Sequence, residues 1–351
     1  SAKDMHFDYI GTTLMVLATT SLILTTTWGG TQYDWSSPTI ITTSAIAVIA
    51  AVLFVLVELR ATNPLIPMDL FKNRNMVLTT LAGTVLGLAM TSGLAYLPTY
   101  LQMVHELTPT EAGLMMLPMV IGMLVTGMAV GFIISKTGRY KIYPLVGMLI
   151  TTLGLYLFSR LEVTTSLTVL GVYMFIFGFG LGLVMQVLVL IVQNSFPVAM
   201  VGTATATNNF FRQLGSSIGA SLVGSLFIHN MRTHMEERMP AAMAQLPPEQ
   251  AQAIGQQFSG GSSNLTPHQV AQLPDAIREV VLTSYNDGLT PVFLLMVPLA
   301  VLAFVILLPV REEALTSALR LLLGRRSPDA HPALAGGSPG FALSDCVNGQ
   351  I

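Results

Sequence analysis

The feature that most constrains this chain is a series of long stretches without a charged side chain. They cover residues 9–33, 35–57, 75–104, 112–135, 142–159, 163–211 and 288–310. A helix that crosses the roughly 30 Å hydrocarbon core of a bilayer needs about 20 apolar residues, because each residue adds about 1.5 Å. The run 163–211 is long enough for two such helices, and Asn194, Ser195 and Pro197 predict a turn between them.

These runs predict an all-α integral membrane protein with eight transmembrane helices. The predicted helices cover residues 10–28, 38–58, 76–101, 112–135, 142–159, 165–190, 203–228 and 289–310. Only 10% of the residues are charged and 52% are hydrophobic. This composition excludes a disordered chain and a water-soluble enzyme with a charged surface, so membrane lipid is an expected partner.

The remaining composition excludes other classes of protein. The net charge of −2 gives no basic surface for nucleic acid, so no nucleic-acid partner is expected. The single cysteine, Cys346, allows neither an internal disulfide nor a cysteine-based metal cluster. No metal and no cofactor are expected.

Lysine and arginine in the short loops predict the orientation of the chain. Basic residues gather in three places that fall on one side of the membrane if the helices alternate. They are Arg60, Lys72 and Arg74, then Lys136, Arg139 and Lys141, and then Arg311, Arg320, Arg325 and Arg326. This side is expected to be the cytoplasm, so both termini of this chain are predicted to be cytoplasmic in a multi-pass protein of the cell inner (plasma) membrane.

The same reading divides the chain into four parts. Residues 1–60 would form two transmembrane helices, 61–75 a cytoplasmic linker, and 76–310 a six-helix bundle with an extracytoplasmic loop at 230–287. Within that loop, prolines 247, 248 and 267 predict two helix starts, and residues 259–263 a flexible link. The tail 311–351 is rich in Pro, Gly, Ala and Ser and is expected to be largely disordered.

Small residues recur at the spacing that lets helices approach closely in lipid. Glycines stand four residues apart at 83 and 87, 127 and 131, and 215 and 219. This pattern predicts close helix packing and is common in polytopic proteins, so it indicates no particular function.

One arginine lies deep inside a predicted span. Arg212 is about 15 Å from the start of helix 203–228, near the middle of the membrane, where a charge normally faces a cavity or a partner. The candidate substrate-cavity residues are Arg212, Gln213, Asn208 and Gln186. The alternative is a buried structural hydrogen-bond network. Because no Asp or Glu lies deep in the eight spans, a proton-coupling carboxylate is missing from this chain.

The basic segment at 131–141 either sets the topology or acts as a gate. Its residues Gly131, Lys136, Gly138, Arg139 and Lys141 resemble the cytoplasmic loop signature of the major facilitator superfamily. Ser135 stands where that signature often has an acid. The resemblance implies a cytoplasmic gate-loop motif made of these five residues.

Three further stretches resemble the fourteen-span drug:proton antiporters of the EmrB/QacA type. They are residues 58–75, residues 192–194 followed by 202–206, and residues 210–215 with Gly219. That family has six spans, two extra central spans and six more. The resemblance therefore implies that this chain is the C-terminal portion, with the two central helices and a six-helix major-facilitator bundle. The missing N-terminal six-helix half would be its partner.

The resemblance implies a multidrug or small-molecule efflux transporter with amphipathic substrates, working by proton-coupled antiport and alternating access. The proton gradient would be its energy source. One alternative is an exporter of an endogenous metabolite, siderophore or lipid, whose segment 230–287 meets an envelope partner. Another is a truncated, non-transporting membrane fragment. An enzyme is not expected, because the six histidines are scattered and form no catalytic constellation.

Overall fold

The computed structural model describes residues 8–30, 32–259 and 265–315, and their regular structure is almost entirely helical. The first elements are α1 (Tyr9–Trp28), α2 (Pro38–Arg60), a short 3-10 helix η1 (Met68–Lys72), α3 (Arg74–Val104) and α4 (Pro109–Met115). They are followed by α5 (Leu117–Thr137), α6 (Ile142–Ser159), α7 (Leu167–Asn194), α8 (Val198–Met243), α9 (Pro248–Phe258), α10 (Pro267–Ala271) and α11 (Asp275–Leu307).

Seven segments of the described chain are long and apolar enough to cross a membrane. They are α1, α2, α3, α4 with α5, α6, α7 and α11. The predicted span 203–228 lies within the 46-residue helix α8, which is not among these seven. The all-helical membrane class is thus supported, whereas the count of eight spans stays a prediction.

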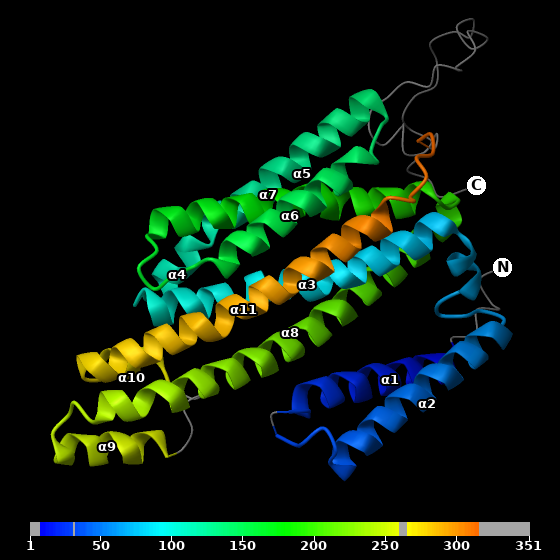
Figure 1. Cartoon of the computed structure of the whole chain (residues 1–351). Coiled ribbons are helices and arrows are strands. Elements are labelled where there is room, and N and C mark those ends of the chain that lie inside the picture. The colour runs from blue at the N-terminus through cyan, green and yellow to red at the C-terminus, as the bar shows by residue number, and fades with distance from the viewer. Residues whose placement is uncertain (1–7, 31, 260–264, 316–351) are drawn as a thin grey trace, which may run out of the picture.

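The long helices pack side by side as a bundle, with α3, α8 and α11 running through its middle (Figure 1). Helix α3 contacts both α8 and α11, and α7 contacts α5 and α6 on one side. The α1–α2 hairpin lies on the other side, where α1 contacts α8. The segments 60–74, 136–141 and 311–315, which carry the described part of the three predicted basic regions, lie at one end of this bundle (Figure 1). Arg320, Arg325 and Arg326 of the third region lie outside the described residues.

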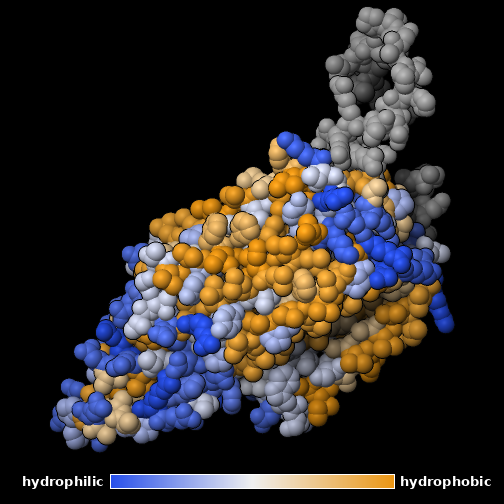
Figure 2. Space-filling view, turned by 45° about the horizontal axis from the view of Figure 1, so that its top comes forward, coloured by the Kyte–Doolittle hydropathy of each residue, from blue (hydrophilic) through white to orange (hydrophobic). Residues whose placement is uncertain are grey.

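The surface of the bundle is apolar around its middle. Figure 2 shows a hydrophobic belt between two hydrophilic ends. Exposed side chains in α2, α5 and α6 contribute to it, including Val48, Val52, Leu124 and Leu153. Such residues need no protein cover when lipid surrounds them, so this belt is the surface expected of a membrane-spanning bundle.

Local sequence signals explain where the helices begin and end. Ser37, Asn73 and Ser166 are N-cap residues whose side chains accept a hydrogen bond from the backbone N–H three residues later. Helix α5 ends at Gly138, which has φ 73° in the left-handed region that glycine adopts without strain.

Glycines bring the backbones of α3 and α8 close together. A Cβ atom on Gly219 would lie 2.8 Å from Leu88 Cα, and one on Gly215 would overlap the carbonyl oxygen of Thr84. The predicted close packing is therefore present at this pair. At Gly131, by contrast, a Cβ would meet nothing within 4 Å.

The predicted loop 230–287 is largely helical. Helix α8 continues to Met243 and α11 begins at Asp275, so both extend well beyond the predicted spans. Helices α9 and α10 begin at Pro248 and Pro267, which confirms the two predicted helix starts. Of the predicted link 259–263, all but Ser259 lies outside the described residues.

The predicted tail 311–351 is described only over residues 311–315. Leu315 is buried, as is Val310 just before the tail, so the chain after α11 stays packed on the bundle here. We call residues 310–315 the C-terminal strap. The rest of the tail, including Cys346, lies outside the described residues.

Candidate functional site

The predicted cavity residues of α8, Asn208, Arg212 and Gln213, form a polar stripe together with Asn209, and we define the polar stripe as these four residues. Asn208 is only 2% exposed, and its Nδ2 donates to Thr80 Oγ1 of α3 at 3.3 Å. The half-buried Arg212 donates from Nη2 to Asn209 Oδ1 at 2.7 Å. None of the ion pairs found in the described part of the chain includes Arg212. The stripe thus offers a cation with hydrogen-bonding capacity to spare.

The two glutamines among the predicted cavity residues are exposed. Gln213 belongs to α8, and Gln186 belongs to α7, where its Cγ would lie 3.3 Å from a Cβ on Gly127 of α5. The described hydrogen bonds do not join Gln186 to Arg212. The structure therefore brings Asn208 and Arg212 together on neighbouring turns and leaves Gln186 on a separate helix. Exposed amides on apolar helices cost free energy in lipid unless they meet water or protein.

An apolar cavity of about 520 Å³ lies beside α8, and none of the residues of the polar stripe lines it. Helices α1, α2 and α8 and the 3-10 helix η1 line it, with aromatic rings from Phe54, Phe71, Phe210 and Phe211. The rings of Phe71 and Phe211 meet edge to face with centroids 6.0 Å apart. Phe210 and Phe211 directly precede Arg212 in sequence, so the wall of the cavity and the polar stripe belong to the same turns of α8.

The predicted gate-loop residues lie where α5 turns into α6. Gly138 closes α5 through its N–H, which donates to Ile134 O at 2.8 Å. Gly131, Lys136 and Arg139 are exposed, and Lys141 is partly buried. Lys136 Nζ lies 4.3 Å from the centre of the Phe132 ring, a cation–π contact. The loop thus presents a cluster of cations at one end of the bundle.

Behind the loop, a polar network holds the C-terminal strap. The hydroxyl of the buried Tyr140 accepts from the N–H of Glu313 at 2.7 Å, and Asn194 Nδ2 donates to Glu313 O at 3.3 Å. Asn75 and Arg311 exchange two hydrogen bonds, at 2.9 and 3.0 Å. Burial raises the pKa of the Tyr140 phenol, so this hydroxyl is neutral at physiological pH.

Sequence analysis missed this network. Asn194 was interpreted as a turn residue and as part of the 192–194 stretch that resembles the antiporter family, and the partners of the strap lie far away along the chain. The only available signal was polarity, because Asn75, Tyr140 and Asn194 are polar residues just outside the ends of predicted helices.

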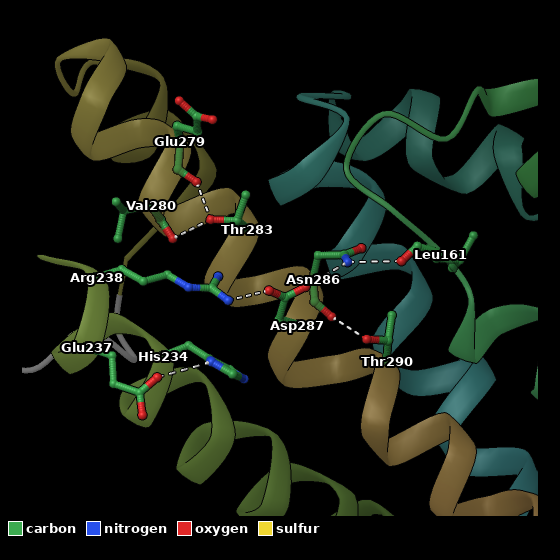
Figure 3. Close-up of polar contacts among 10 residues, drawn as sticks. All are labelled: Leu161, His234, Glu237, Arg238, Glu279, Val280, Thr283, Asn286, Asp287 and Thr290. Carbon is green, nitrogen blue, oxygen red and sulfur yellow. Dashed lines mark hydrogen bonds and ion pairs between the residues drawn. The ribbon is translucent and has the colours of Figure 1, made fainter. Parts of the chain in front are cut away.

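A second network fixes the opposite end of the bundle (Figure 3). Asn286 of α11 accepts from the hydroxyl of Tyr100 at 2.6 Å and donates to Leu161 O at 3.0 Å. Next to it, Asp287 pairs with Arg238 of α8 at 2.6 Å. These contacts attach the extensions of α8 and α11 to each other and to the loop that follows α6.

Comparison with known proteins gives the family. The model of the Major Facilitator Superfamily matches residues 7–220. An uncharacterised MFS-type transporter of Mycobacterium tuberculosis is 34% identical over 309 residues, which cover 88% of this chain and 43% of that protein. Multidrug transporter protein MdtP of Bacillus subtilis is 30% identical over 302 residues, which cover 82% and 56%. The chain thus spans about half the length of these relatives.

A solved structure has a similar fold. It is the inward-facing, unoccupied form of a bacterial homologue of the human lysosomal transporter Spinster, with a TM-score of 0.51. The match covers 91% of this chain and 68% of that chain at 15% identity, and at this identity it shows the fold alone. The match to the family over more than half of the sequence, together with the apolar helices, shows that this chain belongs to the Major Facilitator Superfamily of multi-pass membrane transporters and not to an enzyme family.

Proposed function

We propose that the protein to which this chain belongs exports amphipathic small molecules by alternating access. The observation that carries this proposal is the 520 Å³ apolar cavity, whose wall includes Phe210 and Phe211 from the turns of α8 that also carry Arg212. An amphipathic molecule could place its apolar body against Phe210 and Phe211 and its polar group near Arg212. The similarity to a named multidrug transporter supports the same class of substrate.

The energy source in this proposal is the proton gradient, as in fourteen-span antiporters of the EmrB/QacA type. The chain would supply the two central helices and the C-terminal six-helix bundle, and an N-terminal six-helix half would complete the cavity. The exposed amides of Gln186 and Gln213 would then face water or that half rather than lipid. The cation-rich end would lie in the cytoplasm of a plasma-membrane protein, with the 131–141 loop as its gate.

Transport by the full-length parent in everted membrane vesicles tests this proposal. With a proton gradient imposed, the vesicles should accumulate a fluorescent lipophilic dye, and a protonophore should stop the accumulation. Accumulation that continued unchanged after the gradient collapsed would refute proton coupling. Failure to move any dye of a chemically varied panel would refute multidrug export.

The same vesicles separate transport by the parent from transport by this chain. The 351-residue chain alone should leave dye distribution unchanged in liposomes, because half of the proposed cavity wall is absent. Dye movement by the chain alone would contradict the proposed two-half cavity. A parent that is also inactive would favour the non-transporting alternative.

A second candidate is export of an endogenous metabolite, siderophore or lipid, with an envelope partner on the outer segment. It is favoured by the structure of the outer segment, in which α8 and α11 extend beyond the predicted spans. The short helices α9 and α10 each have a buried apolar residue, Ile254 and Val270 respectively. Deleting residues 246–272 from the parent discriminates the two. Dye export should survive the deletion if the cavity suffices, and should be lost if a partner at this segment is required.

A further inference from the structure

Two carboxyl groups meet at the base of the α1–α2 hairpin. Asp8 is the N-cap of α1, and its Oδ1 accepts from the N–H of Gly11 at 2.8 Å. Glu58 lies in the last turn of α2, is only 2% exposed, and accepts through Oε2 from the N–H of Ile66 at 3.0 Å. The pair therefore connects the start of α1, the end of α2 and the segment that leads to α3.

The second oxygen of each carboxyl group faces the other. Asp8 Oδ2 and Glu58 Oε1 are both buried, and neither receives a hydrogen bond from any described residue. A Cβ atom on Gly11 would touch both of these oxygens, so they lie side by side over that glycine. Two ionised carboxylates do not stay together in a buried space without a cation, because their repulsion adds to the cost of burial.

Among the residues that the structure describes, none forms an ion pair with Asp8 or Glu58. Arg60 is exposed at the end of α2, and Lys72 of η1 is exposed and pairs with Asp69 at 2.6 Å. Arg212 of α8 donates to Asn209. The pKa of the Asp8 carboxyl is lowered, first by a hydrogen bond from Glu58 and then by the N–H of Gly11. Because the ionised form of Asp8 is the favoured one, Glu58 would carry the proton that the pair needs.

We propose that Asp8 and Glu58 form a binding site for a single proton, which fastens the α1–α2 hairpin to the segment before α3. When occupied, Glu58 Oε1 carries a proton taken from water and donates it in an O–H···O⁻ bond to Asp8 Oδ2. When the proton returns to water, two adjacent carboxylates repel each other and the contact with Ile66 weakens. The site does not depend on which substrate the parent exports. The expectation that carboxylates are missing concerned the middle of the spans, whereas this pair lies at helix ends.

Infrared spectroscopy of the purified full-length parent tests the proposal. At neutral pH, the wild-type protein should show the C=O stretching band of one protonated carboxyl group, which Glu58→Gln should remove. The control Glu162→Gln changes an exposed acid in the α6–α7 loop and should leave the band unchanged. A band of the same intensity in Glu58→Gln would overturn the proposal.

Thermal unfolding in detergent provides an independent measurement. Glu58→Gln keeps the acceptor for Ile66 and places a permanent N–H donor opposite Asp8, so it imitates the protonated pair. The unfolding midpoint of the wild type should be lower in mildly alkaline buffer than in mildly acidic buffer, because the stability that the shared proton contributes is lost as pH rises. The midpoint of Glu58→Gln should fall less.

A second variant covers the case in which Glu58→Gln does not fold. Asp8→Asn keeps the acceptor for Gly11 and supplies a donor to Glu58, so it should reduce the pH dependence in the same way. Equal pH dependence in the wild type and in whichever of these variants folds would overturn the proposal. Loss of the pH effect without loss of dye export would leave the proposed transport function intact.

Discussion

Individual residues set how closely the central helices can pack. Gly215 of α8 lies directly against the backbone of α3 at Thr84, and Gly219 does the same at Leu88. Glycines at the spacing seen here were predictable from the sequence, but which of them would meet a neighbour was not. Gly131 has the same spacing to Gly127 and no atom near its missing Cβ, because the contact depends on helix rotation.

We expect Gly215→Ala to destabilise the protein by about 1–3 kcal/mol, since its methyl group would overlap the carbonyl of Thr84. The measurement is the unfolding midpoint in detergent. Gly202→Ala lies on the same helix with nothing within 4 Å of its Cβ and should leave the midpoint nearly unchanged. Equal effects of the two substitutions would show that α8 does not pack on α3 as described.

Arg212 is the residue on which the proposed substrate site most depends. In the full-length parent, Arg212→Ala should abolish dye export, because it removes the half-buried cation proposed to meet the polar group of the substrate. Membrane insertion should stay normal, because none of the ion pairs among the described residues is lost. Transport in vesicles and the amount of protein in the membrane are both measured. The control Arg160→Ala removes an exposed cation in the loop between α6 and α7, away from the proposed substrate site, and should retain export. Survival of export in Arg212→Ala would reduce Arg212 to a structural role.

At the scale of the elements, the strap joins parts of the chain that are distant in sequence. Asn75 and Arg311 are 236 residues apart and exchange two hydrogen bonds. The positions of the helices were predictable, because a charge-free apolar run of about 20 residues is typical of a membrane-spanning helix. The strap and the carboxyl pair were not, because no local pattern reveals a partner so far along the chain. The lengths of α8 and α11 were underestimated, because helical hydrogen bonds continue past the point where apolar residues end.

Tyr140→Phe should release the strap locally. It removes the acceptor of the Glu313 N–H, and the net contribution of such a part-buried hydrogen bond is about 0.5–1.5 kcal/mol. Amide hydrogen exchange at residues 311–315 should therefore become faster. Tyr143→Phe, at a partly buried position one turn away on α6, is the control and should leave exchange at the strap unchanged. Unchanged exchange in Tyr140→Phe would mean that other contacts hold the strap.

At the scale of the whole molecule, the bundle has one cation-rich end, and its orientation can be measured. In a Cys346→Ser background, Thr137→Cys and Gln252→Cys place single exposed thiols at opposite ends of the described structure. A membrane-impermeant thiol reagent applied to intact cells should label position 252 and not position 137. Labelling at 137 alone would reverse the predicted topology, and disrupted cells serve as the control for reactivity.

The length of α8 has a mechanical consequence. Its 46 residues extend for roughly 69 Å, more than twice the thickness of the hydrocarbon core. If the bundle tilts by about 10° around the middle of the membrane, near Arg212, the far tip of this helix at Met243 moves sideways by roughly 8 Å. A small rotation within the lipid would then cause a larger displacement of α9, because α9 lies beyond the far end of α8. A molecule bound to α9 from the water would move with it.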